Sequence, residues 1–329
     1  MSLTEACEGL RWGAVGQKLE QSLAILNGVL GDHLARTGNG LATALSFVHE
    51  GAALAMESPA FARAVPSPRP KLAVLVHGLM CTERVWKMPD GSDYGSLLER
   101  DLAVTPLYVR YNSGRAIAEN GAALADLLES LADVYPVAIE EIIPIGFSMG
   151  GLVIRSACNA AKKRGHTWLS RVTRAIYIGT PHLGSPLERA GRFLVRTLRN
   201  VPDPYTRLIA DIGDLRSLGL RNLGDGHLWH DDGPASAVPL SDRRHPVPLL
   251  PEMSHYLIAG ALATEPRLAF WFGDALVPLS SATAGACAEV ASVALPPDHV
   301  KIFHAFAHMR LARDPAVYAQ IRGWCEARS

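Results

Sequence analysis

Residues 145–151 read Ile-Gly-Phe-Ser-Met-Gly-Gly and place one serine, Ser148, between glycines at a change of pattern. The residues before it, 141–145, form a run typical of a strand, and residues 152–157 have a pattern typical of a helix. A Gly-x-Ser-x-Gly sequence in this strand–turn–helix context is typical of a sharp turn at the top of a sheet. The chain is therefore expected to fold around a sheet whose strand leads into this turn.

The turn makes Ser148 a candidate nucleophile. The glycines beside it fit a strained turn in which strand and helix pass too close for a Cβ atom. A serine hydroxyl is a poor nucleophile at neutral pH, so it needs a base to accept its proton and an acid to orient that base. The alternative is a glycine-rich turn that carries an inert serine.

Length and composition favour a folded α/β protein. The 329 residues suffice for one large domain with an insertion or for two ordinary domains. Apolar residues make up 48% and charged residues 19%, which predicts a sizeable core. A formal net charge of zero gives no indication of a nucleic-acid partner. The five cysteines are scattered along the chain, so we expect reduced thiols. The sequence shows no signal-peptide pattern and no apolar run long enough to span a membrane, so we expect a cytoplasmic location.

Strand and helix patterns alternate along the chain. Leucines spaced by three and four residues predict a helical segment over 1–36, which precedes a domain over 37–329. The strands expected in the core are 71–76, 107–111, 142–145, 175–178, 255–262 and 300–306. The alternation predicts an α/β fold with a doubly wound, mostly parallel sheet and helices on both faces. Ligands of such sheets bind at the carboxyl ends of the strands, where the loops 77–80, 146–151 and 179–185 are expected.

Residues 186–250 interrupt this alternation and are interpreted as a cap or lid insertion over the site. A capping box at 185–188 predicts a helix whose arginines share one face over 187–199. Such a basic amphipathic helix can contact a lipid interface, or it can be an ordinary surface helix with solvated arginines. The stretch His227–Asp232 contains two histidines and two aspartates, but it lacks the partner set of a metal site. We expect neither metal nor cofactor.

The acid and the base should follow Ser148 in the order acid, then histidine. Asp274 is the preferred acid because it lies in a Gly-Asp turn after an apolar aromatic run, although a turn aspartate can also bond only nearby backbone. His308, just past the last strand, is the preferred base. His304 is the second choice because it is expected inside a packed strand, and His299 lies at the wrong end of the sheet. The remaining acids considered are Asp211, Asp214, Asp225, Asp231, Asp232 and Asp242.

Backbone N–H groups are expected to stabilise the negative charge that forms on a tetrahedral intermediate. Such donors come from the residue after the nucleophile and from the first strand–helix loop. They are Met149 and Leu79, with Met80 as the second choice for the loop. His77 is interpreted as a structural hydrogen-bonding residue because it precedes Ser148 in the chain. Cys81, beside this loop, is interpreted as a small buried side chain rather than a second nucleophile.

Four ordered segments, 74–79, 146–151, 179–185 and 273–278, resemble those of the α/β-hydrolase superfamily in its lipase and esterase branch. The resemblance covers residues 71–329. It implies an α/β-hydrolase fold and a catalytic triad of Ser148, Asp274 and His308. Two positions depart from the pattern: Phe147 stands where lipases commonly have histidine or tyrosine, and Ala275 stands where glycine is frequent. Neither departure removes a reacting group.

These observations predict a serine hydrolase that cleaves carboxylic esters of small molecules or lipids through an acyl-enzyme. The same triad would also serve an acyltransferase, a thioesterase or an amidase. A non-catalytic binding protein with this fold is the alternative from another class.

Overall fold

The computed structural model describes residues 3–49, 51–182, 248–262, 277, 279–283 and 295–326, with backbone alone for 3–15 and 280–281. The strands are β1 (Ser46–His49), β2 (Ala52–Ala53), β3 (Lys71–Val76), β4 (Thr105–Arg110), β5 (Glu141–Phe147), β6 (Arg174–Ile178), β7 (Ser254–Ala261) and β8 (Val300–His304). The α-helices are α1 (Leu3–Arg36), α2 (Ser58–Ala64), α3 (Tyr94–Leu102), α4 (Ile117–Val134), α5 (Met149–Arg164), α10 (Leu279–Ala282) and α11 (Pro315–Glu326).

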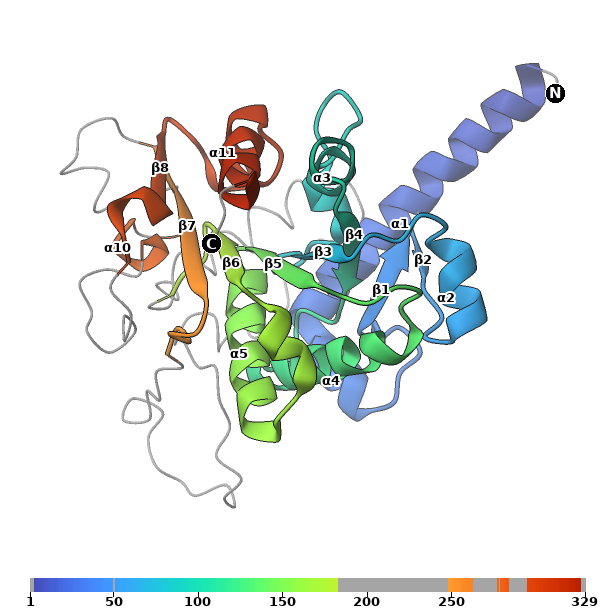
Figure 1. The fold of residues 1–329 in the computed structure, drawn as a ribbon. Helices are drawn as coiled ribbons and strands as arrows, with labels where there is room; N and C mark the ends of the chain where they lie inside the picture. Colours follow the sequence, from blue (N-terminus) through green and yellow to red (C-terminus); the bar gives the residue numbers. More distant parts are fainter. Residues whose placement is uncertain are drawn as a thin grey trace, which may run out of the picture.

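The described strands form one eight-stranded sheet in the order β2-β1-β4-β3-β5-β6-β7-β8 (Figure 1). The six strands from β4 to β8 in that order are parallel, and the β1–β2 hairpin adds to the edge of β4 in the antiparallel direction. Every carboxyl end of the parallel strands therefore faces the same edge, and β5 brings Ser148 to that edge near the middle of the sheet.

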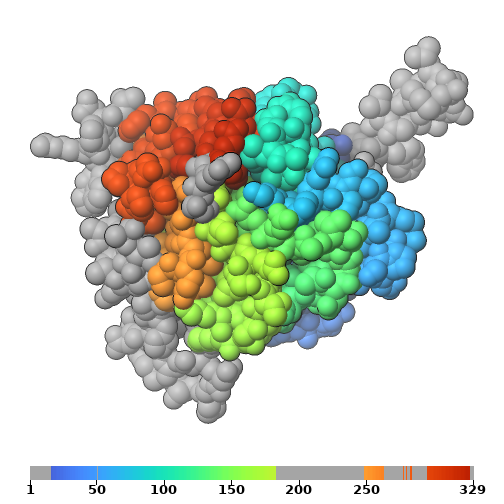
Figure 2. Space-filling view, in the orientation of Figure 1, coloured from blue at the N-terminus to red at the C-terminus, as the bar shows by residue number. Residues whose placement is uncertain are grey.

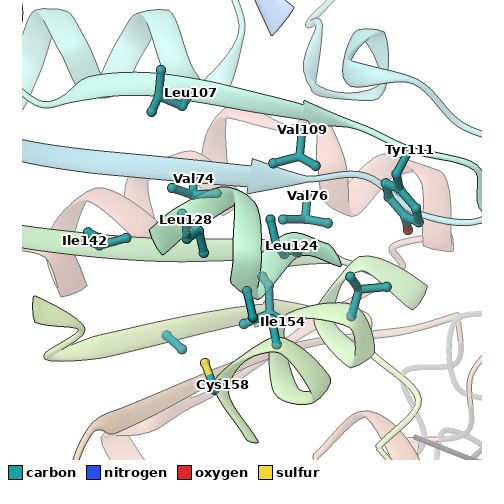
Figure 3. Packing of buried hydrophobic residues seen from close by; sticks show 14 of the residues in the cluster. Val74, Val76, Leu107, Val109, Tyr111, Leu124, Leu128, Ile142, Ile154 and Cys158 are labelled. Carbon is teal, nitrogen blue, oxygen red and sulfur yellow. The ribbon is translucent and has the colours of Figure 1, made fainter. Parts of the chain in front are cut away.

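Helices cover both faces of the sheet, because alternate residues of each strand point to opposite sides. In β3, Val74 and Val76 point into the core under α4 and α5, where they meet Leu124 and Leu128 of α4 (Figure 3). Leu75 of the same strand belongs to the core on the other face, which is packed by α3 and α11. Figure 2 shows α3 and α11 side by side on that second layer. The predicted doubly wound, mostly parallel sheet with helices on both faces is confirmed.

The N-terminal helix packs on the same face as α4 and α5. Ile25 and Val29 are buried in that core, whereas Leu19 is 70% exposed. The face of α1 that meets the core is therefore set by its tertiary contacts. The cap segment 186–250, except 248–250, and the basic helix 187–199 lie outside the described residues. None of the helices in the described part of the chain has the length and hydropathy needed to cross a membrane.

Helices α4 and α5 approach closely at Gly121, and this contact generates a prediction. A Cβ atom at position 121 would overlap the side chain of Ser156 in α5. Gly121→Ala is expected to destabilise the protein by about 1–3 kcal/mol, since overpacking outweighs the gain in helix propensity. Urea unfolding at pH 7 measures the change.

Gly323→Ala in α11 is the matched control. A Cβ atom there would meet nothing within 4 Å, so the same substitution should stabilise the protein by up to about 1 kcal/mol. Equal effects of the two substitutions would contradict the close contact between α4 and α5.

Candidate active site

Ser148 occupies a strained turn between β5 and α5. Its backbone has φ 53° and ψ −123°, a region that non-glycine residues rarely adopt. The turn is held from both sides: the Ser148 N–H donates to the Ile178 carbonyl of β6 at 2.8 Å, and a Cβ atom at Gly150 would overlap the Val76 carbonyl of β3. The Ser148 side chain is only partly buried. The turn predicted from residues 145–151 is therefore present, and solvent can reach its serine.

His308 lies against this turn. It begins a short 3-10 helix, His308–Ala312, after β8 and is 4% exposed. Its ring packs on Phe147, with 4.9 Å between the ring centroids, and a Cβ atom at Gly179 would lie 3.0 Å from its Cε1 atom. Phe147 directly precedes Ser148, and Gly179 directly follows the residue that accepts the Ser148 N–H. His308, the predicted base, therefore lies beside the turn that carries Ser148.

The alternative base, His304, lies elsewhere. It is the last residue of β8 and is exposed. The expectation that its side chain is packed in a layer is wrong: within the described part of the chain β8 is the last strand of the sheet, and His304 at its end is exposed. His299 precedes β8, and its Nδ1–H donates to the His255 carbonyl at 3.1 Å, at the amino end of the strand as expected.

The acid of the predicted triad lies outside the described residues, because Asp274 belongs to the stretch 263–276. The other acids considered, at 211–242, lie outside them as well. The assignment of Asp274 stays a prediction.

The loop after β3 meets the turn at Ser148. A Cβ atom at Gly78 would lie 3.1 Å from Cβ of Ser148, so the backbone of this loop passes directly beside the serine. The Met80 N–H donates to Oγ of Ser113 at 3.0 Å and is engaged there, which leaves Leu79 as the better of the two loop donors. Met149 begins α5, where the first N–H groups have no acceptor within the helix. The backbone at Gly78 and the start of α5 thus flank Ser148, and the donor roles of Leu79 and Met149 stay predictions.

His77 holds the same loop, in agreement with the structural role expected for it. Its Nδ1–H donates to the Gly78 carbonyl at 2.8 Å, and its ring stacks on Tyr111 with 4.4 Å between centroids. Burial lowers the pKa of His77 to about 4, so the ring is neutral at pH 7. The Gly78 carbonyl and the Leu79 N–H belong to one planar trans peptide and point in opposite directions. The bond from His77 therefore also orients the Leu79 N–H.

The environment of Cys81 disfavours a reactive thiolate at neutral pH. Its N–H donates to the Gly78 carbonyl at 3.3 Å, and burial raises the pKa of its thiol to about 12. The thiolate is the reactive form of cysteine, and this pKa leaves almost none of it at pH 7.

The described sheet and the turn at Ser148 together decide the fold. A strained serine turn, on a strand in the middle of a mostly parallel sheet covered on both faces, is the arrangement that defines this class. The chain has an α/β-hydrolase fold.

Comparisons by sequence find no matching family model and no matching curated protein. Solved structures with a similar arrangement include the mature form of a Bacillus licheniformis lipase, at 18% identity and TM-score 0.46 over 78% of this chain and 93% of that one. A lipase-esterase related protein from Clostridium acetobutylicum is similar at 15% identity and TM-score 0.45, over 85% and 99% of the two chains. A prodiginine-pathway thioesterase from Streptomyces coelicolor is similar at 16% identity and TM-score 0.42, over 79% and 91%.

Sequence reasoning missed a buried polar cluster beneath α5. Arg155, 2% exposed, donates from its guanidinium to Nδ1 of His182 at 3.1 Å. Tyr177 of β6 packs edge-on against His182 and donates from its hydroxyl to Nδ1 of His255 at 3.2 Å. His255 donates from Nε2 to the carbonyl of Leu250 at 2.8 Å. The one signal in the sequence was an arginine inside the otherwise apolar and small-residue run 152–157.

The cluster holds two histidines that are neutral in the folded protein. Burial, with Arg155 nearby, lowers the pKa of His255 to about 4, and the same causes push the pKa of His182 well below its ordinary value. The pKa of His77 is also lowered, but by its burial against Tyr111 rather than by this cluster.

These depressed pKa values predict that the protein loses stability in acid. Each of these histidines has a lower pKa in the folded than in the unfolded protein, so the unfolded state binds more protons once the pH falls below about 6.5. The free energy of unfolding therefore decreases as the pH falls from about 6.5 toward 4. Between pH 7 and pH 5, His77 and His255 should each reduce the free energy of unfolding by about 2 kcal/mol. Urea unfolding at the two pH values measures the loss.

His255→Phe should show a loss between pH 7 and pH 5 that is smaller by about 2 kcal/mol, whatever its stability at pH 7. His49→Gln, at an exposed position of β1, should show the wild-type loss. An unchanged pH dependence in His255→Phe would contradict a buried neutral ring at that position.

Proposed function

We propose that this protein is a serine hydrolase that cleaves carboxylic esters of small molecules or lipids through Ser148, His308 and Asp274. The observation that carries the proposal is the turn at Ser148. A backbone at φ 53° costs on the order of 1–3 kcal/mol and persists only where surrounding structure holds it. Here that strain presents a partly exposed hydroxyl at the carboxyl edge of a parallel sheet, where ligands of such sheets bind.

The neighbours of Ser148 support nucleophilic catalysis rather than an inert turn. In the proposed mechanism the Ser148 hydroxyl attacks the acyl carbonyl, and His308 accepts its proton. Asp274 would hold the His308 ring in the required tautomer and stabilise its charged form. The packing of His308 on Phe147 and Gly179 supports its role, because it fixes the ring beside the nucleophile turn.

The tetrahedral intermediate carries a negative charge on the former carbonyl oxygen. The N–H groups of Leu79 and Met149 are the proposed donors to that oxygen. Collapse of the intermediate expels the alcohol, which takes the proton from His308, and leaves an acyl group on Ser148. Water, activated by the same histidine, then releases the acid and restores the enzyme.

A fluorophosphonate probe tests the nucleophile directly. Purified wild-type protein should be labelled covalently and should hydrolyse short p-nitrophenyl esters, whereas Ser148→Ala should lose labelling and reduce kcat by on the order of 10⁶-fold. Folded wild-type protein that takes no label would overturn the proposal. Labelling at Ser148 without turnover of esters, but with turnover of thioesters or amides, would keep the nucleophile and change the substrate class.

Two histidine variants separate the base from its alternative. His308→Gln should reduce kcat by on the order of 10⁴- to 10⁶-fold, because the proton of Ser148 then has no acceptor. His304→Gln, at the exposed end of β8, should retain kcat within about threefold. Ester hydrolysis by the two purified variants measures the difference. The opposite result would make His304 the base.

A further inference from the structure

The loop that carries Leu79 has an unusual backbone at its next residue. Met80 has φ 58°, in the left-handed region that residues with a Cβ atom seldom adopt, and its side chain is 2% exposed. A backbone of this kind needs contacts that outweigh its cost. Three such contacts come from outside the loop.

Two of the contacts come from α1. The Gln21 side chain donates from Nε2 to the Met80 carbonyl at 3.3 Å. At Gly28, about two turns further along the same face of α1, a Cβ atom would overlap Cγ of Met80, so the Met80 side chain lies directly on the helix backbone. Only glycine at position 28 leaves room for it.

The third contact comes from the loop between β4 and α4. Oγ of Ser113, 2% exposed, accepts the Met80 N–H at 3.0 Å. This bond and the one from Gln21 fix the peptide groups on both sides of Met80.

Helix α1 and the loop between β4 and α4 also contact each other directly. Asn112 donates from its side chain to the Gly31 carbonyl of α1 at 2.8 Å, and Asn120 of α4 donates to the Asn112 carbonyl at 2.9 Å. A Cβ atom at Gly114 would overlap the Asn27 carbonyl of α1. A shift of α1 would therefore move Ser113 and Met80 together.

We propose that α1 acts on the reaction at Ser148, with Gly28 and Ser113 as positioning residues that hold the Leu79 N–H on the developing oxyanion. This inference rests on the proposed function. Leu79 and Met80 are adjacent, so a change in the Met80 backbone rotates the Leu79 peptide away from the oxyanion position. The charge exists only in the intermediate and the transition state, so the effect falls on kcat rather than on substrate binding.

The experiment compares Gly28→Ala and Ser113→Ala with Gly16→Ala as the control. Gly16 lies in the same helix, and a Cβ atom there would meet nothing within 4 Å. For each folded variant, kcat per fluorophosphonate-labelled site and KM are measured on a p-nitrophenyl ester. Affinity for a trifluoromethyl ketone, which forms a charged tetrahedral adduct with a serine, is measured in parallel.

Gly28→Ala and Ser113→Ala should each reduce kcat about 10- to 100-fold with KM within about twofold, and weaken the trifluoromethyl ketone by a similar factor. Gly16→Ala should match the wild type. Wild-type kcat per labelled site in Ser113→Ala would overturn the inference, even if Gly28→Ala does not fold. A wild-type protein that neither takes the label nor cleaves esters would instead refute the proposed function.

Discussion

The turn at Ser148 is possible only because two strands and a helix meet there without side chains between them. Gly146 and Gly150 let β5 and α5 lie against each other and against the β3 backbone, since a Cβ atom at either position would overlap a main-chain atom. The Ser148 N–H is then bonded across to β6. The strain is held by the parallel sheet on both sides, and so the reactive geometry depends on the order β3-β5-β6 in the middle of the sheet.

This constraint explains why the fold could be predicted from sequence. Continuous apolar strands, the glycine pattern around Ser148 and the regular alternation with helices are local signals, and the structure places them on one sheet. The β1–β2 hairpin gives no clear signal in the sequence, because its strands are only four and two residues long. Leucine spacing indicates a helix over 1–36 but not its buried face, because the contacts that bury Ile25 and Val29 come from residues far along the chain.

The site was predictable to the extent that its residues lie at strand ends. Ser148, His308 and the loop of Leu79 meet at the carboxyl edge of the sheet, as the ordering of motifs suggested. The polar cluster of Arg155, His182, Tyr177 and His255 was not predictable, because its members are far apart in sequence and no local pattern indicates that they meet. Its hydrogen bonds exist only once β6, β7 and α5 are packed.

The two sides of the candidate oxyanion site differ in what holds them. The Met149 N–H is fixed by α5 itself, which begins at the turn, so its direction is a property of the core. The Leu79 N–H belongs to a loop, and loops need contacts from elsewhere to keep a fixed geometry. His77 supplies one such contact from within the loop, and α1 and Ser113 supply the others from outside it. The N-terminal helix precedes every sheet strand in sequence, yet it packs on one of the two backbone segments that flank Ser148. In the proposed mechanism, transition-state stabilisation at Ser148 therefore depends on residues of α1 that act through Met80.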